Sequence, residues 1–177
     1  MDASSPPFVI DIRLRTIGEL FASLDPSPLV ERDLDDAVEE FIVDSVTDAP
    51  RQQAIGLVVH LAEPAPETDA RSIETSVRNY FAFMAGREAR RVKRLWRDGR
   101  QALLVGLAFL VVCLGLSQAA AAIGQPAGAI LREGLLIIGW VANWRPIEIF
   151  LYDWRPIRRR KRVYERLSQL TVTVRTP

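Results

Sequence analysis

The sequence of 177 residues contains one cysteine, Cys113, and one histidine, His60. A single cysteine excludes an intrachain disulfide and a cysteine-based metal site. A single histidine leaves few groups for acid–base catalysis, because His is the side chain that most often performs it. No EF-hand loop, P-loop or HExxH motif is present. We therefore predict no catalytic, cofactor-binding or metal-binding residues, and a protein that is not an enzyme.

Each half of the chain is poor in charge of one sign. Residues 1–86 contain 6 basic and 16 acidic residues, whereas residues 87–177 contain 17 basic and 6 acidic residues. Such a split indicates an acidic soluble part and a part that meets something anionic. The first twenty residues lack a basic start followed by an apolar core, so we expect no signal peptide.

Residues 102–123 contain no charged side chain over 22 positions. As a helix they would extend about 33 Å, which matches the hydrocarbon core of a bilayer. A second segment, residues 129–152, contains four charged residues but is long enough to return across the membrane. The two segments predict a transmembrane helical hairpin.

Basic residues flank both predicted spans. Residues 87–100 and 155–166 contain seven each, and the turn at 124–128 contains none. The positive-inside rule then predicts a multi-pass protein of the cell inner membrane with both termini in the cytoplasm. No nucleic-acid-binding motif accompanies these residues, so membrane lipids are the expected anionic partner. We expect anionic-lipid contacts from Arg94, Arg97, Arg100, Arg155, Arg158 and Arg159.

Arg145 and Glu148 lie within the second predicted span, three residues apart, where a helix would allow them to pair. An intramembrane pair of this kind marks a pathway or an interhelical contact, unless Arg145 extends to the cytoplasmic headgroups. Pro146 can kink the helix at this point. Small residues such as Gly106 and Gly115 would let spans of several copies approach closely, so a homo-oligomer is expected.

Three segments have the alternation or β-branched content of strands, namely residues 8–15, 54–63 and 170–176. Because both termini are expected on one side of the membrane, the third can pair with the first two. The predicted fold is an α+β cytoplasmic domain of three short strands plus helices, with an inserted two-helix transmembrane hairpin. The predicted divisions are residues 1–100, 101–153 and 154–177, the last being a basic helix and a strand that pack on the first domain.

Helix signals lie between the strands. Thr16 and Glu19 match a capping box, and Asp33 can cap a helix over residues 34–46 whose apolar stripe includes Phe41. No proline interrupts residues 68–124, so one helix could continue from the first domain into the first span.

The helix over residues 34–46 is dense in carboxylates. No calcium-type ligand loop accompanies them, so a solvated or partner-facing acidic surface is expected rather than a metal site. This predicted surface consists of Asp35, Asp36, Glu39 and Glu40.

Two segments, "LDPSPLVERDLD" and "GWVANWRPIEIFLYDWRPIRRR", resemble those of a group of small bacterial two-helix membrane proteins. The resemblance implies a bacterial cytoplasmic membrane. It brings no activity, cofactor or catalytic residue with it.

The predicted function is that of a membrane-anchored interaction or regulatory protein that presents its cytoplasmic domain to a partner. The partner would be another copy of the chain or another membrane or cytoplasmic protein. An alternative is an oligomeric channel or transport subunit that uses Arg145 and Glu148 in its interior. A membrane enzyme that uses His60 is a third possibility.

Overall fold

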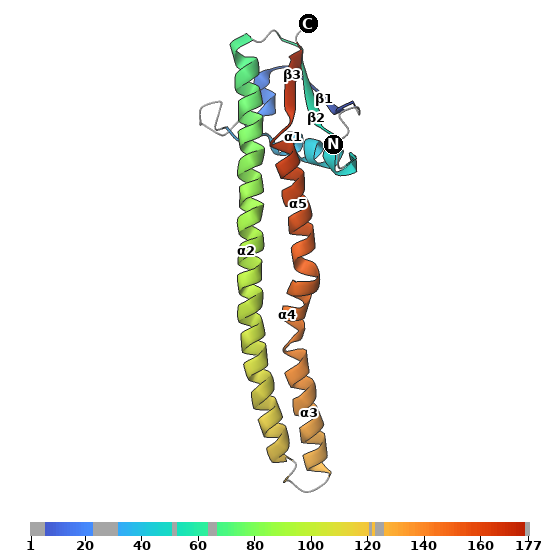
Figure 1. Ribbon diagram of the computed structural model, residues 1–177, viewed down its shortest axis with the longest axis vertical. Coiled ribbons are helices and arrows are strands. Elements are labelled where there is room, and N and C mark those ends of the chain that lie inside the picture. Colours follow the sequence, from blue (N-terminus) through green and yellow to red (C-terminus); the bar gives the residue numbers. More distant parts are fainter. Residues whose placement is uncertain are drawn as a thin grey trace. The chain divides into compact units, whose positions relative to one another are not determined.

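The computed structural model describes residues 6–22, 32–50, 53–63, 67–120, 122 and 126–175. The chain forms two compact units. Figure 1 shows the helices and strands, coloured along the sequence. The first, which we call the α+β unit, combines Met1–Glu88 with Arg159–Pro177, and the second, the helical unit, is Ala89–Arg158. The predicted boundaries at residues 100 and 153 both lie inside the helical unit, because continuous helices lead into and out of it.

The α+β unit contains a three-stranded sheet. Its strands β1 (Phe8–Leu14), β2 (Ile55–Leu61) and β3 (Thr171–Arg175) lie in the order β1-β2-β3, and both pairs are parallel. The three predicted strands are confirmed to within two residues. Parallel neighbours need long crossover connections, and the connection from β2 to β3 includes the whole helical unit.

One face of this sheet forms the core. Alternate residues of β1 and β2 are buried on it, among them Ile10 and Ile12 of β1 and Leu57 and Val59 of β2. Side chains of α1 (Asp36–Asp48), of the first part of α2 (Glu67–Ala120) and of the end of α5 (Trp154–Leu167) join them in one hydrophobic cluster. The largest fully buried side chains are Tyr164, Phe21, Phe81, Leu20, Leu34, Ile42, Leu57 and Ile73.

One predicted helix start is wrong, whereas the other lies after Thr16 as predicted but lacks a side-chain capping bond from Thr16. Asp35, not Asp33, caps α1, with its Oδ1 accepting from the Ala37 N–H at 3.0 Å. Leu34 instead forms an antiparallel bridge with Phe21, and the Asp33 carbonyl accepts from the Ala22 N–H at 2.9 Å. The predicted capping box forms only the short 3-10 helix η1 (Ile17–Leu20), since the Glu19 carboxylate bonds the Arg15 N–H at 2.9 Å.

Helix α2 runs without interruption through 54 residues, as the absence of proline predicted. Its length is about 80 Å. The stretches Arg71–Ala120 and Ala127–Leu167 are both long and apolar enough to cross a membrane. Only 17% and 22% of their most apolar windows are buried within the chain, unlike the core helices of soluble proteins, which are mostly buried.

The second stretch is four helical segments rather than the single predicted helix over 129–152. Both copies of the WRPI sequence begin a new α-helical segment, at Trp144 and at Trp154. Each proline is the third residue of its segment, where its missing N–H costs no intrahelical bond. Its ring would clash with the carbonyl four residues earlier, so the break precedes the proline. The segments are α3 (Ala127–Val141), α4 (Trp144–Glu148), the π-helix η3 (Ile149–Asp153) and α5.

Within the helical unit, α3 and α4 lie alongside the second half of α2 (Figure 1). The face of α2 that meets them has a small residue every seventh position, at Gly99, Gly106, Cys113 and Ala120, and all four are buried. A seven-residue repeat keeps one face of a helix against its neighbour. The predicted close approach of small residues therefore occurs inside one chain.

The glycine contacts are too tight for a side chain. A Cβ on Gly106 would lie 2.7 Å from Oδ1 of Asn143, and one on Gly139 would lie 2.8 Å from Cδ1 of Leu110. Asn143 links the two glycines, because its Nδ2 donates to the Gly106 carbonyl at 3.1 Å and to the Gly139 carbonyl at 3.0 Å. Gly115, by contrast, has open space around it.

We predict that Gly106→Leu and Gly139→Leu each destabilise the helical unit by about 1–3 kcal/mol, because the added side chain forces α2 and α3 apart. Gly115→Leu is the matched control and should change the stability by about 0.5 kcal/mol or less. Thermal unfolding in detergent, followed by circular dichroism, measures both effects. Equal effects at the three glycines would contradict the packing described here.

Candidate functional site

Glu39 is the acidic residue that the structure places differently from the sequence prediction. It is only 9% exposed and lies inside the α+β unit, not on a partner-facing surface. Its Oε2 accepts from the Tyr80 hydroxyl at 2.5 Å, and its Oε1 accepts from the Tyr164 hydroxyl at 2.6 Å. The signal was present in the sequence, since Glu39 precedes the buried Ile42 by three residues and therefore shares its face of the helix.

The positive charge of Arg160 lies close to the Glu39 carboxylate. Arg160 donates from Nε to the Tyr164 hydroxyl at 2.9 Å, and its Nη2 lies 3.9 Å from Oε1 of Glu39. Burial, followed by the hydrogen bond to Glu39, raises the pKa of Tyr164 to about 12. The same two causes raise the pKa of Tyr80 even further above its ordinary value. Both hydroxyls thus keep their protons and donate to the carboxylate, which joins α1, α2 and α5.

Phe41 of α1 is exposed, although the sequence prediction assigned it to the buried stripe. It is 52% exposed and projects from the acidic side of the helix, next to Glu40 and Asp44. Asp36 is exposed on the same helix, whereas the Asp35 side chain is engaged in capping. Of the four predicted acidic-surface residues, Asp36 and Glu40 therefore remain available to a partner.

Two depressions flank the Phe41 ring. One of about 260 Å³ is lined by residues of β1 and by Ala37, Val38 and Phe41. The other, of about 460 Å³, is lined on α1 by Ala37, Glu40, Phe41, Asp44, Ser45 and Asp48, which we call the acidic Phe41 surface. Three of those six residues are carboxylates and one is an aromatic ring, so the surface suits a partner that carries both positive charge and an apolar side chain.

The structure brings Arg145 and Glu148 together, with Nη1 of Arg145 3.3 Å from Oε2 of Glu148. Nη1 is also 3.3 Å from Oδ2 of Asp153, a third member that the sequence prediction missed. Trp144 donates from its ring N–H to Glu148 at 3.1 Å. The guanidinium is therefore neutralised within its own chain and needs no partner on a neighbouring helix.

The six arginines that were expected to contact anionic lipid are all exposed. Two of them lie over aromatic rings, Arg155 6.0 Å from the centre of Tyr152 and Arg158 5.5 Å from that of Trp154. The others are Arg94, Arg97, Arg100 and Arg159, and of these Arg97 lies 3.9 Å from Asp98.

His60 pairs with Asp11 on the neighbouring strand, with Nε2 2.9 Å from Oδ1. Among the residues that the structure describes, no three His, Cys, Asp or Glu side chains converge to hold a metal ion. Cys113 is buried in the helical unit.

Comparison of the chain with protein-family models, with curated proteins and with solved structures finds no match. The resemblance to small bacterial membrane proteins thus stays a prediction.

We predict that Tyr164→Phe destabilises the α+β unit by about 1–3 kcal/mol at neutral pH, because buried Glu39 loses a donor. The pKa of Tyr164 rises from 10.0 in the unfolded chain to about 12 in the fold, so the folded state holds this proton more tightly. The resulting stability is complete below about pH 10 and is lost as the pH rises through about 12.

Because phenylalanine cannot ionise, the variant should lose less stability than the wild type between about pH 9 and 12. Thermal unfolding of both chains across this range measures the difference, and Tyr80 leaves a residual slope in each. Parallel pH profiles for the two chains would show that ionisation of Tyr164 does not contribute to the pH dependence of stability.

Proposed function

We propose that this protein is a membrane-anchored interaction or regulatory protein, in which the helical unit anchors the α+β unit to the cytoplasmic face of a bacterial inner membrane. The α+β unit then presents the acidic Phe41 surface to a protein partner. The observation that carries this proposal is the 52% exposure of Phe41 between two depressions, next to Glu40 and Asp44.

Three features support the membrane anchor. Two helical stretches are long and apolar enough to span a bilayer and bury little of their apolar surface within the chain. Many large hydrophobic side chains are exposed on them, including Leu104 and Val105 at 69% each and Ile130 at 71%. Basic residues flank the apolar stretches on the side of both termini, which favours the cytoplasm for the α+β unit.

The docking role follows from the energetics of protein interfaces. Aromatic side chains at the centre of an interface contribute much of the binding free energy, and surrounding charges set orientation and association rate. An exposed phenylalanine among carboxylates is costly to leave in water, and it gains most from a partner segment with Lys or Arg around an apolar side chain. A basic, apolar-bearing protein segment is therefore the partner we propose.

The Arg145 cluster favours an anchor over the channel alternative. A charge that lines a pathway has to remain available to the transported species. Arg145 already lies between Glu148 and Asp153 at 3.3 Å from each. We propose that these three residues and the ring N–H of Trp144 stabilise the helical unit near the cytoplasmic headgroups.

To test the docking role, a photo-crosslinking phenylalanine analogue replaces Phe41 in the full chain in cells. Phe83, on α2 of the same unit and 56% exposed, gives a matched control position. We expect a crosslinked partner protein from position 41 and not from position 83. Sequencing of the adduct should then identify a basic segment.

In the same proposal, Phe41→Ala should weaken partner binding by about tenfold or more. Glu40→Lys combined with Asp44→Lys should abolish partner binding. Binding of the partner by the wild type should weaken as the salt concentration rises. Thermal unfolding should be unchanged by Phe41→Ala, since the ring is half exposed. Equal adducts from positions 41 and 83, or recovery of this chain alone in mild detergent, would overturn the proposal.

A further inference from the structure

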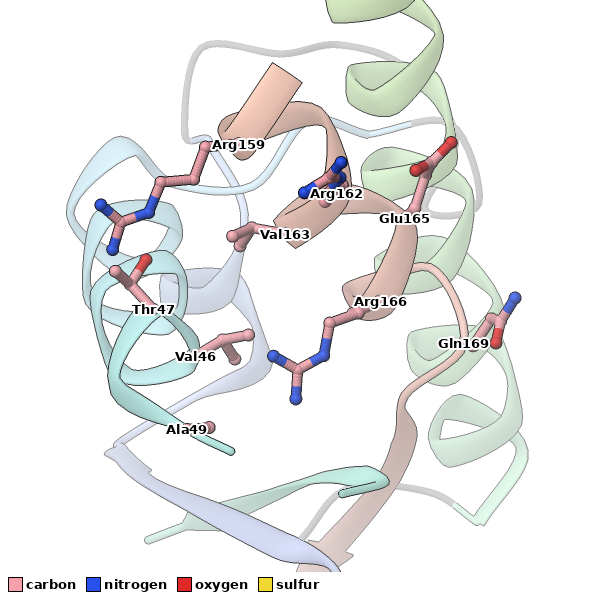
Figure 2. A pocket seen from close by; sticks show the side chains of 9 residues that line it. All are labelled: Val46, Thr47, Ala49, Arg159, Arg162, Val163, Glu165, Arg166 and Gln169. Carbon is pink, nitrogen blue, oxygen red and sulfur yellow. The ribbon is translucent and has the colours of Figure 1, made fainter. Parts of the chain in front are cut away.

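A cavity of about 400 Å³ lies in the α+β unit between the end of α1 and α5. Figure 2 shows Arg159, Arg162 and Arg166 projecting from α5 around it, opposite Val46 and Thr47 of α1. The three arginines are three and four residues apart, so they share one face of the helix. The described residues that line it are Val46, Thr47, Ala49, Arg159, Arg162, Val163, Glu165, Arg166 and Gln169.

One of these arginines is held firmly in place. Nη2 of Arg166 donates to the Pro50 carbonyl at 2.8 Å and to the Gln53 carbonyl at 3.3 Å. Neither carbonyl neutralises its charge. Its remaining N–H groups belong to a guanidinium whose position is already fixed, which lowers the entropy cost of binding an anion.

The described lining of the cavity contains three arginines and one carboxylate, so its positive charge is in excess. Throughout the described part of the chain, neither Arg159 nor Arg162 forms an ion pair or hydrogen bond with another residue. Glu165 is the one carboxylate among the nine described lining residues, and it pairs with Lys161 at 2.9 Å. The cavity thus presents three guanidinium groups to a ligand.

The rest of the lining defines the kind of anion. Val46, Ala49 and Val163 form the apolar part of the lining, against which an uncharged part of a ligand can pack. A volume of about 400 Å³ exceeds what one phosphate ion needs and falls in the range of small-molecule sites. None of the nine lining residues is aromatic, so the cavity offers no stacking surface for a nucleobase.

We propose that this arginine cavity binds a phosphate ester of a small organic molecule. Guanidinium groups form paired hydrogen bonds with phosphate oxygens, and three of them can neutralise a dianion or a phosphodiester with its neighbouring groups. The ester is either the headgroup of an anionic phospholipid or a soluble phosphorylated metabolite. This site is distinct from the acidic Phe41 surface, and it does not depend on a protein partner.

The test uses the full chain in detergent or in nanodiscs, with isothermal titration calorimetry. The soluble probes are inorganic phosphate and glycerol 3-phosphate, and the lipid probes are nanodiscs of phosphatidylglycerol or of phosphatidylcholine. The cavity variant is Arg159→Gln with Arg162→Gln. The control variant, Arg155→Gln with Arg158→Gln, removes the same charge from the same helix but outside the lining.

If a soluble ester is the ligand, glycerol 3-phosphate binds the wild type at one site per chain, and the cavity variant loses about tenfold or more in affinity. If a lipid headgroup is the ligand, only phosphatidylglycerol nanodiscs bind, and the cavity variant again loses more than the control variant. In the first case the control variant keeps the wild-type affinity for glycerol 3-phosphate, and in the second case neither soluble probe binds any of the three chains.

A second pair of substitutions controls for loss of the fold. Arg159→Lys with Arg162→Lys keeps the positive charge but removes the planar guanidinium groups, so affinity should fall while thermal unfolding stays unchanged. Absence of saturable binding to any of the probes would overturn the proposal. So would equal losses in the cavity and control variants, since these would indicate general attraction to positive charge.

Discussion

The parallel pairing of β2 with β3 limits how the chain between these two strands can cross a membrane. These strands are parallel neighbours, with Gly56 opposite Thr171 and His60 opposite Arg175, yet the entire helical unit separates them in sequence. A parallel pair requires both strands in one compartment, because a sheet cannot form across a bilayer. Any membrane that the helical unit enters must therefore be crossed an even number of times, which two apolar stretches satisfy.

The buried carboxylate of Glu39 stabilises the place where the chain leaves the α+β unit and returns to it. Its two donors come from α2, which leads out, and α5, which leads back, while Glu39 belongs to α1. Burial of a carboxylate is costly unless hydrogen bonds and a nearby cation compensate it, and here Tyr80, Tyr164 and Arg160 supply both. The same packing places the arginines of α5 around the cavity, because α5 lies beside α1 with one face toward the core.

The periodicity of the sequence made much of this fold predictable. Contacts between residues far apart in the sequence could not be predicted. Alternation predicted the three strands, and the absence of proline predicted the 54-residue helix. Glu39 was misplaced because its donors are 41 and 125 residues away, and charged residues on amphipathic helices usually face solvent. The shift of the α1 cap came from backbone pairing at Asp33, and the exposure of Phe41 from a core that Ile42 and Val46 already fill. The sequence predicted one helix over 129–152, whereas each copy of WRPI begins a new α-helical segment.

The most direct test of this account is the side of the membrane on which three positions lie. With Cys113 replaced by alanine, single cysteines are introduced at Asp36, Ala127 and Thr173, all exposed in the structure. Intact spheroplasts are then treated with a membrane-impermeant maleimide. We expect that only position 127 is labelled before permeabilisation, and that positions 36 and 173 are labelled together afterwards. Labelling of 36 and 173 from opposite sides would contradict it, because β3 could not then pair with β2.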